Sequence, residues 1–267
     1  MSGYIFDNAA EEPTTQRFAS LEALYDPRTI RFLEATGVGP GWRCLEVGGG
    51  SGSIATWLAD RVGATGHVLV TDIDPRFLAG LAAAGRPNVE VRRHDVGTDP
   101  LPEGAFDLVH ARLVLIHVPQ AAAALVRLAA ALRPGGWLIV EDFDPTFIDR
   151  AFPTADAADA TVVHTAFEAL GELLVARGAG RGWGRSLYQR FVSLGLAEVG
   201  MEGHLTVRPG GSAGARLDAA NFVQIREAAV EGKLITAEDF DRMLALLDDP
   251  ACAFASPTMF TAWGRHP

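Results

Sequence analysis

The sequence predicts an α/β fold in which a mostly parallel sheet is covered by helices on both faces. Short apolar runs alternate with helical patterns between Trp42 and Asp144. These runs are apolar enough for burial on both faces, which is typical of parallel strands joined by crossover helices. A glycine-rich turn follows the first run, where open α/β sheets bind nucleotide-like ligands. The chain has 267 residues, 48% of them apolar, so it is long enough to bury its core as one domain.

Charge and composition exclude several classes of function. The net charge of -10 and the pI near 5.1 disfavour nucleic acids and anionic membranes as partners, because proteins that bind them usually carry a basic face. Lys233 is the only lysine, and its distance from the glycine-rich turn argues against Schiff-base enzymes and P-loop NTPases. The spacing of Cys44 and Cys252 suggests neither a zinc site nor a disulfide, so we expect no metal and a reducing, cytoplasmic environment. We expect no signal peptide and no membrane span.

The N-terminal segment, residues 13–36, has apolar residues at helical spacing. Asp26-Pro27 interrupts this pattern, and proline is favoured in the first turn of a helix, so the segment predicts two helices.

The central segments alternate regularly. Strands are predicted at residues 43–47, 67–72, 89–93, 106–111 and 136–142, and helices at 54–62, 76–84 and 121–132.

After Asp144 the order changes. The sequence predicts a helix at 156–177, a Gly- and Arg-rich loop at 177–185, a helix ending near 194, a strand near 199–207, helices at 215–230 and 236–247, and a last strand near 254–264.

The glycine-rich turn, residues 46–53, lies between a predicted strand and a predicted helix. Glycines let the backbone turn sharply and approach a ligand, and the start of the helix offers unpaired N–H groups. Asp72 ends the second strand, where a carboxylate accepts hydrogen bonds from ribose hydroxyls in such folds. Asp95 follows the third strand, at a position beside the adenine. A glycine turn with both acids predicts a site for an adenosine-containing cofactor.

Five segments in sequence order resemble the motifs of class I S-adenosylmethionine-dependent methyltransferases. They are Glu46-x-Gly48-x-Gly50-x-Gly52, and residues 70–74, 94–96, 106–109 and 132–137. The resemblance covers about residues 40–145, and the flanking regions are similar to the small-molecule branch of the family. It implies a single domain with a Rossmann-like sheet of seven strands, the last of them antiparallel. Residues 1–38 would form a helical lid, 39–145 the cofactor-binding core, and 146–267 the helical insertions and last two strands on the acceptor side.

The resemblance also implies that S-adenosyl-L-methionine is the cofactor. Glu46, Gly48, Gly49, Gly50 and Gly52 would hold its methionine portion, Asp72 with the adjacent Ile73 the ribose, and Asp95 with Val96 the adenine. Two arginines are further candidates. Arg17 either reaches the cofactor or the acceptor from the lid, or lies on a solvated helix face. Arg112 follows the fourth strand and either contacts ligand or braces the loop.

The expected reaction is methylation of a small molecule, with secondary metabolism as one setting, at an oxygen, nitrogen or carbon atom that the sequence does not specify. The acceptor would be held in line with the methyl group under the helical cap. Four residues near the ends of the fourth and fifth strands are candidates for proton transfer: His117 first, then His110, Glu141 and Asp142. His117 has a structural alternative, which is to cap the helix that begins near Pro119 or to pack beneath the loop.

Two other classes of function stay open. An NAD(P)-dependent oxidoreductase shares the glycine turn and the ribose acid, but Ser53 stands at the third glycine position of that motif and the chain has no Tyr-x-x-x-Lys pair. A non-catalytic domain that only binds S-adenosylmethionine is the second alternative. The sequence also leaves a homodimer open. Five aromatic residues are candidate walls of an acceptor pocket: Phe143, Phe147, Phe152, Trp183 and Tyr188.

Overall fold

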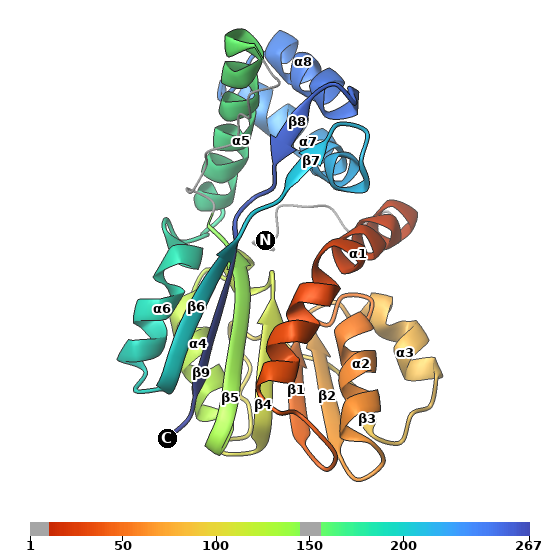
Figure 1. Ribbon diagram of the computed structural model, residues 1–267, viewed down its shortest axis with the longest axis vertical. Helices are drawn as coiled ribbons and strands as arrows, with labels where there is room; N and C mark the ends of the chain where they lie inside the picture. Colours follow the sequence, from red (N-terminus) through yellow and green to blue (C-terminus); the bar gives the residue numbers. More distant parts are fainter. Residues whose placement is uncertain (1–10, 145–155) are drawn as a thin grey trace.

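The computed structural model describes residues 11–144 and 156–267, and its sheet has the predicted architecture (Figure 1). Across the seven-stranded sheet the order is β3 (Val89–Arg93), β2 (His67–Asp72), β1 (Arg43–Val47), β4 (Phe106–Arg112), β5 (Leu132–Phe143), β9 (Met259–Arg265) and β6 (Ala197–His204). The first five of these pair in parallel, and β9 lies antiparallel to both β5 and β6. The predicted α/β sheet with an antiparallel last strand is confirmed.

Helices cover both faces of the sheet because successive strand residues point to opposite faces. Cys44, Leu108 and Ile139 pack on one face with α1 (Glu11–Ala35), α2 (Ser53–Val62) and α3 (Ala79–Ala83). Leu45 and Val109 pack on the other face with α4 (Ala121–Ala130) and α6 (Trp183–Ser193). The two faces therefore have separate apolar cores, and the carboxyl ends of the parallel strands meet at one edge.

The N-terminal segment differs from the prediction, because α1 is one helix of 25 residues with Pro27 inside it. Proline removes one N–H donor from the helix but does not end it where the residues on both sides are held by packing. Tyr25 and Thr29 flank the proline and are 6% and 1% exposed. The helix changes direction along its length and crosses over the carboxyl edge of the sheet (Figure 1).

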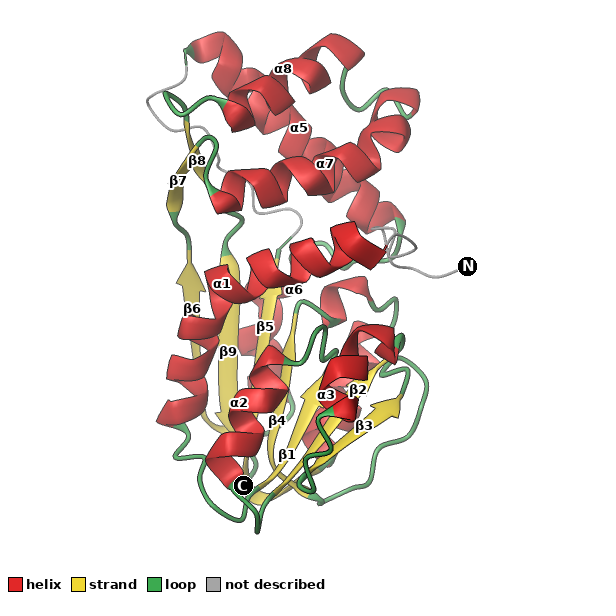
Figure 2. Ribbon diagram, turned by 90° about the vertical axis from the view of Figure 1, so that its right-hand side faces the viewer, coloured by secondary structure: helices red, strands yellow, loops and turns green. Residues whose placement is uncertain are grey.

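A helical cap stands beyond that edge (Figure 2). It consists of α5 (Ala157–Ala176), α7 (Ala213–Glu231), α8 (Ala237–Asp248) and the two-stranded sheet of β7 (Val207–Pro209) and β8 (Ala253–Ala255). The cap has its own core, in which the ring of Phe222 lies 4.9 Å from that of Phe167 and 6.1 Å from that of Phe240.

Three predictions for the second half were wrong in detail. The predicted strands near 199–207 and 254–264 are each divided in two, because the chain leaves the main sheet to form β7 and β8. At the crossing, the Thr206 N–H donates to Ser256 Oγ at 3.0 Å. The helix α6 begins at Trp183, inside the predicted loop. Of the candidate pocket aromatics, Phe147 and Phe152 lie outside the described residues. In the described parts of the chain, no helix has the length and apolar character needed to cross a membrane.

Candidate active site

The glycine-rich turn joins β1 to α2 at the carboxyl edge. Gly48 has a φ of +69°, and a Cβ atom there would lie only 2.1 Å from Val114 Cγ2. Gly50 has a φ of +56°, but a Cβ there would meet its nearest neighbour, Phe18 Cδ1, at 3.7 Å. Position 48 therefore requires glycine for both space and backbone conformation, whereas position 50 requires it for conformation alone.

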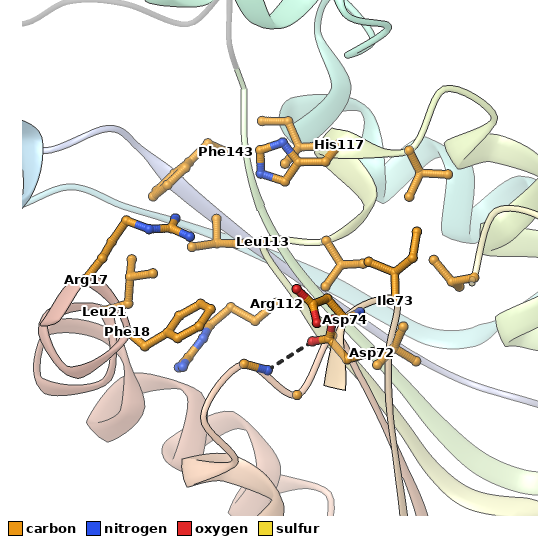
Figure 3. A pocket seen from close by; sticks show the side chains of 18 of the residues that line it. Arg17, Phe18, Leu21, Asp72, Ile73, Asp74, Arg112, Leu113, His117 and Phe143 are labelled. Atoms are coloured by element: carbon orange, nitrogen blue, oxygen red, sulfur yellow. Dashed lines mark hydrogen bonds between the residues drawn. The ribbon is translucent and has the colours of Figure 1, made fainter. Parts of the chain in front are cut away.

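A cavity of about 1140 Å³ opens beside this turn (Figure 3). The predicted residues that line it are Glu46, Gly48, Gly49, Gly50, Asp72, Ile73, Asp95, Val96, Arg112, Arg17 and His117. Gly52, His110 and Asp142 were also predicted for the site but do not line the cavity. Gly52 is instead the N-cap residue of α2, where a Cβ would lie 2.9 Å from Leu81 Cδ2.

Two carboxylates face the cavity from neighbouring strand ends. Asp72 accepts hydrogen bonds from the backbone N–H of Gly50 at 3.3 Å and of Asp74 at 2.9 Å, as the dashed line to the glycine turn shows (Figure 3). Burial raises the pKa of Asp72. Asp95 accepts a hydrogen bond from the Gly97 N–H at 2.8 Å. The backbone thus fixes both acids at the cavity wall.

His110 lies inside the sheet and is fully buried. Its Nδ1 is 2.7 Å from Glu46 Oε2, and its Nε2 is 3.3 Å from Glu141 Oε2. Burial opposes the charged form, but the two carboxylates outweigh it and raise the pKa of His110 to about 9. The imidazole is therefore a buried cation between two carboxylates, with both of its nitrogens engaged.

Asp142 is also fully buried and braces the sheet edge rather than facing the cavity. It accepts hydrogen bonds from the indole N–H of Trp183 at 2.9 Å and from the backbone N–H of Ile116 at 3.2 Å. Burial raises the pKa of Asp142 to about 8. Its contacts tie β5 to α6 and to the turn η2 (Leu115–His117).

His117 does line the cavity (Figure 3). Burial, with a smaller contribution from the nearby charge of Arg17, lowers the pKa of His117 to about 4. The ring is therefore neutral near pH 7, and its low pKa makes it a weak acceptor of the proton that we expected His117 to take from the acceptor. The helix α4 begins at Ala121, and the side chain of its N-cap residue, Gln120, makes no capping hydrogen bond, so a structural role for His117 at this helix or loop stays a prediction.

The two candidate arginines line the cavity from opposite elements. Arg112, at the end of β4, donates hydrogen bonds to Asp26 Oδ1 at 2.7 Å and to Thr29 Oγ1 at 2.8 Å, so it braces α1. Arg17, on α1, is only 7% exposed and points into the cavity (Figure 3). The alternative of a solvated helix face for Arg17 was wrong.

Sequence reasoning missed most of the wall opposite the glycine turn. This wall is largely apolar and comes from α1, α5 and α7: Phe18, Leu21, Tyr25, Phe167, Leu170, Leu174, Leu217, Asp218, Asn221 and Phe222. The apolar members have helical spacing, which in the sequence indicates a core face as readily as a pocket. Of the candidate pocket aromatics, Phe143 lines the cavity, whereas Trp183 and Tyr188 do not.

Comparisons with known proteins agree with this geometry. Residues 45–140 match the family described as methyltransferase domain. Methyltransferase str3 of Strobilurus tenacellus is 33% identical over 138 residues, which are 49% of this chain and 47% of that protein. The ubiquinone/menaquinone biosynthesis C-methyltransferase UbiE of Laribacter hongkongensis is 34% identical over 118 residues, 42% of this chain and 47% of that protein. The chain spans about half the length of these curated relatives.

A solved structure extends the likeness beyond the matched segment. The crystal structure of a SAM-dependent methyltransferase from Aquifex aeolicus covers 96% of this chain, and this chain covers 98% of it, with a TM-score of 0.52 and 17% sequence identity. At that identity the likeness concerns the fold alone. Residues 45–140 therefore match a methyltransferase domain, within a fold shared with a SAM-dependent methyltransferase, and both findings agree with the class I S-adenosylmethionine-dependent family that the sequence motifs resemble. S-adenosyl-L-methionine is the cofactor of that family.

Proposed function

We propose that the chain binds S-adenosylmethionine along the glycine turn and transfers its methyl group to a small-molecule acceptor under the helical cap. The described part of residues 1–38, in α1, would act as a lid over the core, residues 39–145. Residues 146–267 would supply the acceptor side.

The chemistry of the cavity wall suits this cofactor. S-adenosylmethionine carries cationic amino and sulfonium groups, two ribose hydroxyls and a flat adenine with an amino group. Glu46 offers a carboxylate beside the turn, Asp72 offers acceptors for ribose hydroxyls, and Asp95 lies next to the apolar Val96.

One observation carries the proposal: a single cavity joins the cofactor-type strand ends to the cap. Asp72 and Asp95 line it on the sheet side, and Phe167 and Leu174 line it on the cap side. Its volume of about 1140 Å³ exceeds the roughly 300–1,000 Å³ that is usual for one drug-sized ligand. A domain that only binds the cofactor has no need of this second, largely apolar part.

The bound cofactor supplies an activated methyl group, so the chain's own task is to position the acceptor and to exclude water. Holding two reactants in line contributes roughly 7 to 11 kcal/mol to such reactions. Apolar side chains of α1, α5 and α7 line the cavity opposite the glycine turn and would exclude water from the acceptor. His117 offers a neutral ring for hydrogen bonding to the acceptor, and Arg17 offers a buried cation beside it.

The acceptor is a small molecule in this proposal, and its methylated atom is an oxygen, nitrogen or carbon. The name of the UbiE relative specifies a C-methyltransferase, so carbon acceptors belong in the test. Because the net charge is -10, we do not propose a nucleic-acid substrate.

The test is transfer of a deuterated methyl group. The protein is incubated with S-adenosylmethionine that carries a CD₃ group and with fractionated metabolite extracts, and labelled products are sought by mass spectrometry. We expect a labelled small molecule with the wild type and, at a cofactor concentration near the wild-type Kd, much less of it with a folded Asp72→Ala variant. Cofactor binding without transfer to any fraction would favour the non-catalytic alternative.

A further inference from the structure

A buried chain of polar contacts links the helix α1 to the carboxylate of Glu46. The Thr29 hydroxyl, on α1, donates to Glu141 Oε2 on β5. The same oxygen is 3.3 Å from His110 Nε2 on β4, and His110 Nδ1 is 2.7 Å from Glu46 Oε2 on β1. All four residues are at most 4% exposed. We call these four residues the relay.

Hydrogen bonds around the relay determine where Glu141 is held. A hydroxyl has one proton to donate, and Thr29 gives it to Glu141 while accepting from Arg112 Nη1 at 2.8 Å. Arg112 also holds Asp26, so α1 is fastened at two successive turns. The second oxygen of Glu141 accepts from the Thr261 hydroxyl on β9 at 2.8 Å. The position of Glu141 therefore depends on one hydroxyl from the sheet and one from α1.

His110 passes this dependence on to Glu46. Its two nitrogens face one carboxylate each, so the orientation of the ring is set jointly by Glu141 and Glu46. Charge-assisted contacts of this kind are stronger and more directional than neutral hydrogen bonds. Because His110 contacts both carboxylates, we expect a shift of Glu141 to turn the ring and to move the carboxylate of Glu46, which lines the cavity.

We infer that His110 is a positioning residue that couples the docking of α1 to the orientation of the Glu46 carboxylate toward the cofactor. This inference rests on the proposed function, because it needs Glu46 to contact the cofactor. It also gives His110 a role other than the proton transfer expected from the sequence. Coupling of this kind is reciprocal, so bound cofactor holds α1 in place by the same factor as docked α1 improves cofactor binding.

The test compares two variants that each remove one hydroxyl from Glu141. Thr29→Val breaks the contact from α1, and Thr261→Val breaks the matched contact from β9. S-adenosylhomocysteine is titrated into each protein by calorimetry, and amide hydrogen exchange of residues 14–34 is measured with and without it. We expect Thr29→Val to weaken binding by about 5- to 150-fold and to lose the protection of α1 that the ligand induces. Thr261→Val should keep that protection, and Thr29→Ser should restore both properties.

A double-mutant cycle separates coupling from simple anchoring of the helix. If His110 couples α1 to Glu46, the effects of Thr29→Val and His110→Gln on S-adenosylhomocysteine affinity are non-additive. The reason is that either change alone already interrupts the hydrogen bonds between α1 and Glu46. If His110→Gln does not fold, Glu46→Gln takes its place in the cycle. Additive effects on affinity, together with wild-type-like protection of α1 from hydrogen exchange in Thr29→Val, would overturn this inference and leave the proposed function standing. Failure of the wild type to bind S-adenosylhomocysteine would overturn the proposed function and the inference together.

Discussion

Burial and neighbouring carboxylates together decide which of the histidines near the cavity carry a charge. Burial lowers the pKa of His117 to about 4, whereas the two neighbouring carboxylates raise the pKa of His110 to about 9. The histidine that the sequence favoured as a base is thus the neutral one, and the charged histidine supports a cofactor-side carboxylate. Sequence spacing placed both at the carboxyl edge but contains no information about their surroundings.

The Asp72 carboxylate gives the first prediction. Asp72→Ala removes the proposed acceptors for the ribose hydroxyls, and charge-assisted hydrogen bonds contribute about 1.5 to 3 kcal/mol each. We therefore expect S-adenosylhomocysteine affinity, measured by calorimetry, to fall by roughly 10- to 150-fold. Asp60→Asn is the control, because Asp60 does not line the cavity. Unchanged affinity in a folded Asp72→Ala protein would show that the ribose is held elsewhere.

The neutral ring of His117 gives the second prediction, which concerns the pH dependence of catalysis. A group with a pKa of about 4 is a poor general base near neutral pH, where catalysis favours a pKa close to the working pH. We expect the profile of kcat against pH to show no ionisation of His117 between about pH 6 and 9. His117→Asn should lower kcat at all pH values in that range without changing the shape of the profile. A step near pH 6.5 that is present in the wild type and absent from His117→Asn would restore His117 as the base.

At the scale of elements, the strand–turn–helix unit from β1 to α2 supplies the third prediction. Gly48→Ala should abolish S-adenosylhomocysteine binding and lower stability, because its Cβ would overlap Val114. Gly50→Ala should cost only the strain of a left-handed alanine, of order 1 to 2 kcal/mol, and should retain measurable binding.

Val114, the side chain that a Cβ at position 48 would overlap, provides the control for the comparison of Gly48→Ala with Gly50→Ala. Val114→Ala removes the methyl group that blocks position 48, so the Gly48→Ala/Val114→Ala double variant should recover part of the lost melting temperature. No recovery would mean that backbone conformation, not space, is what position 48 requires.

The elements differ in how far the sequence predicted them. Most elements between residues 43 and 143 were predictable because their apolar periods are clear and the glycine turn is a local signal. The predicted helix at 76–84 is instead a 3₁₀-helix, Pro75–Leu78, followed by the short α3, and β5 begins at Leu132, before the predicted strand at 136–142. The two strands β7 and β8 have three residues each, which is too short for any period to show. The continuity of α1 across Pro27 depends on the burial of Tyr25 and Thr29 against distant elements, which local sequence does not reveal.

The same limit applies to the site. The cofactor side was predicted because Glu46 to Gly50, Asp72 and Asp95 come from strand ends that parallel topology brings together. The acceptor side joins Tyr25 of α1 to Phe167 of α5 and Asp218 of α7, and no pattern within any one of these helices indicates that they meet.

For the whole molecule, the buried titratable groups predict how stability varies with pH. His110 and Asp142 have raised pKa values of about 9 and 8 in the folded state, against 6.5 and 3.8 as ordinary values. The folded protein therefore holds protons that the unfolded chain releases, and the free energy of unfolding falls as pH rises through those windows. His117, with its pKa lowered, contributes in the opposite direction only below about pH 6.5.

Between about pH 6.5 and 8, His110 and Asp142 both lower the free energy of unfolding as the pH rises, and His117 no longer opposes them. We expect the free energy of unfolding in urea to fall over that range, by at most about 1.4 kcal/mol per pH unit for each group. Asp142→Asn keeps an oxygen to accept from Trp183 and Ile116 but does not ionise, so its slope should be shallower. Stability that rises with pH over this range would contradict the assigned charge states.

The most direct measurement is amide hydrogen exchange over the whole chain with and without S-adenosylhomocysteine. It asks whether one cavity at the carboxyl edge holds the cofactor beneath α1 and the cap. We expect the ligand to slow exchange at residues 46–53, 71–74 and 94–98, with slower exchange in α1 as well. Binding that protects other segments and leaves these three strand ends unchanged, or no binding at all, would contradict the proposed site.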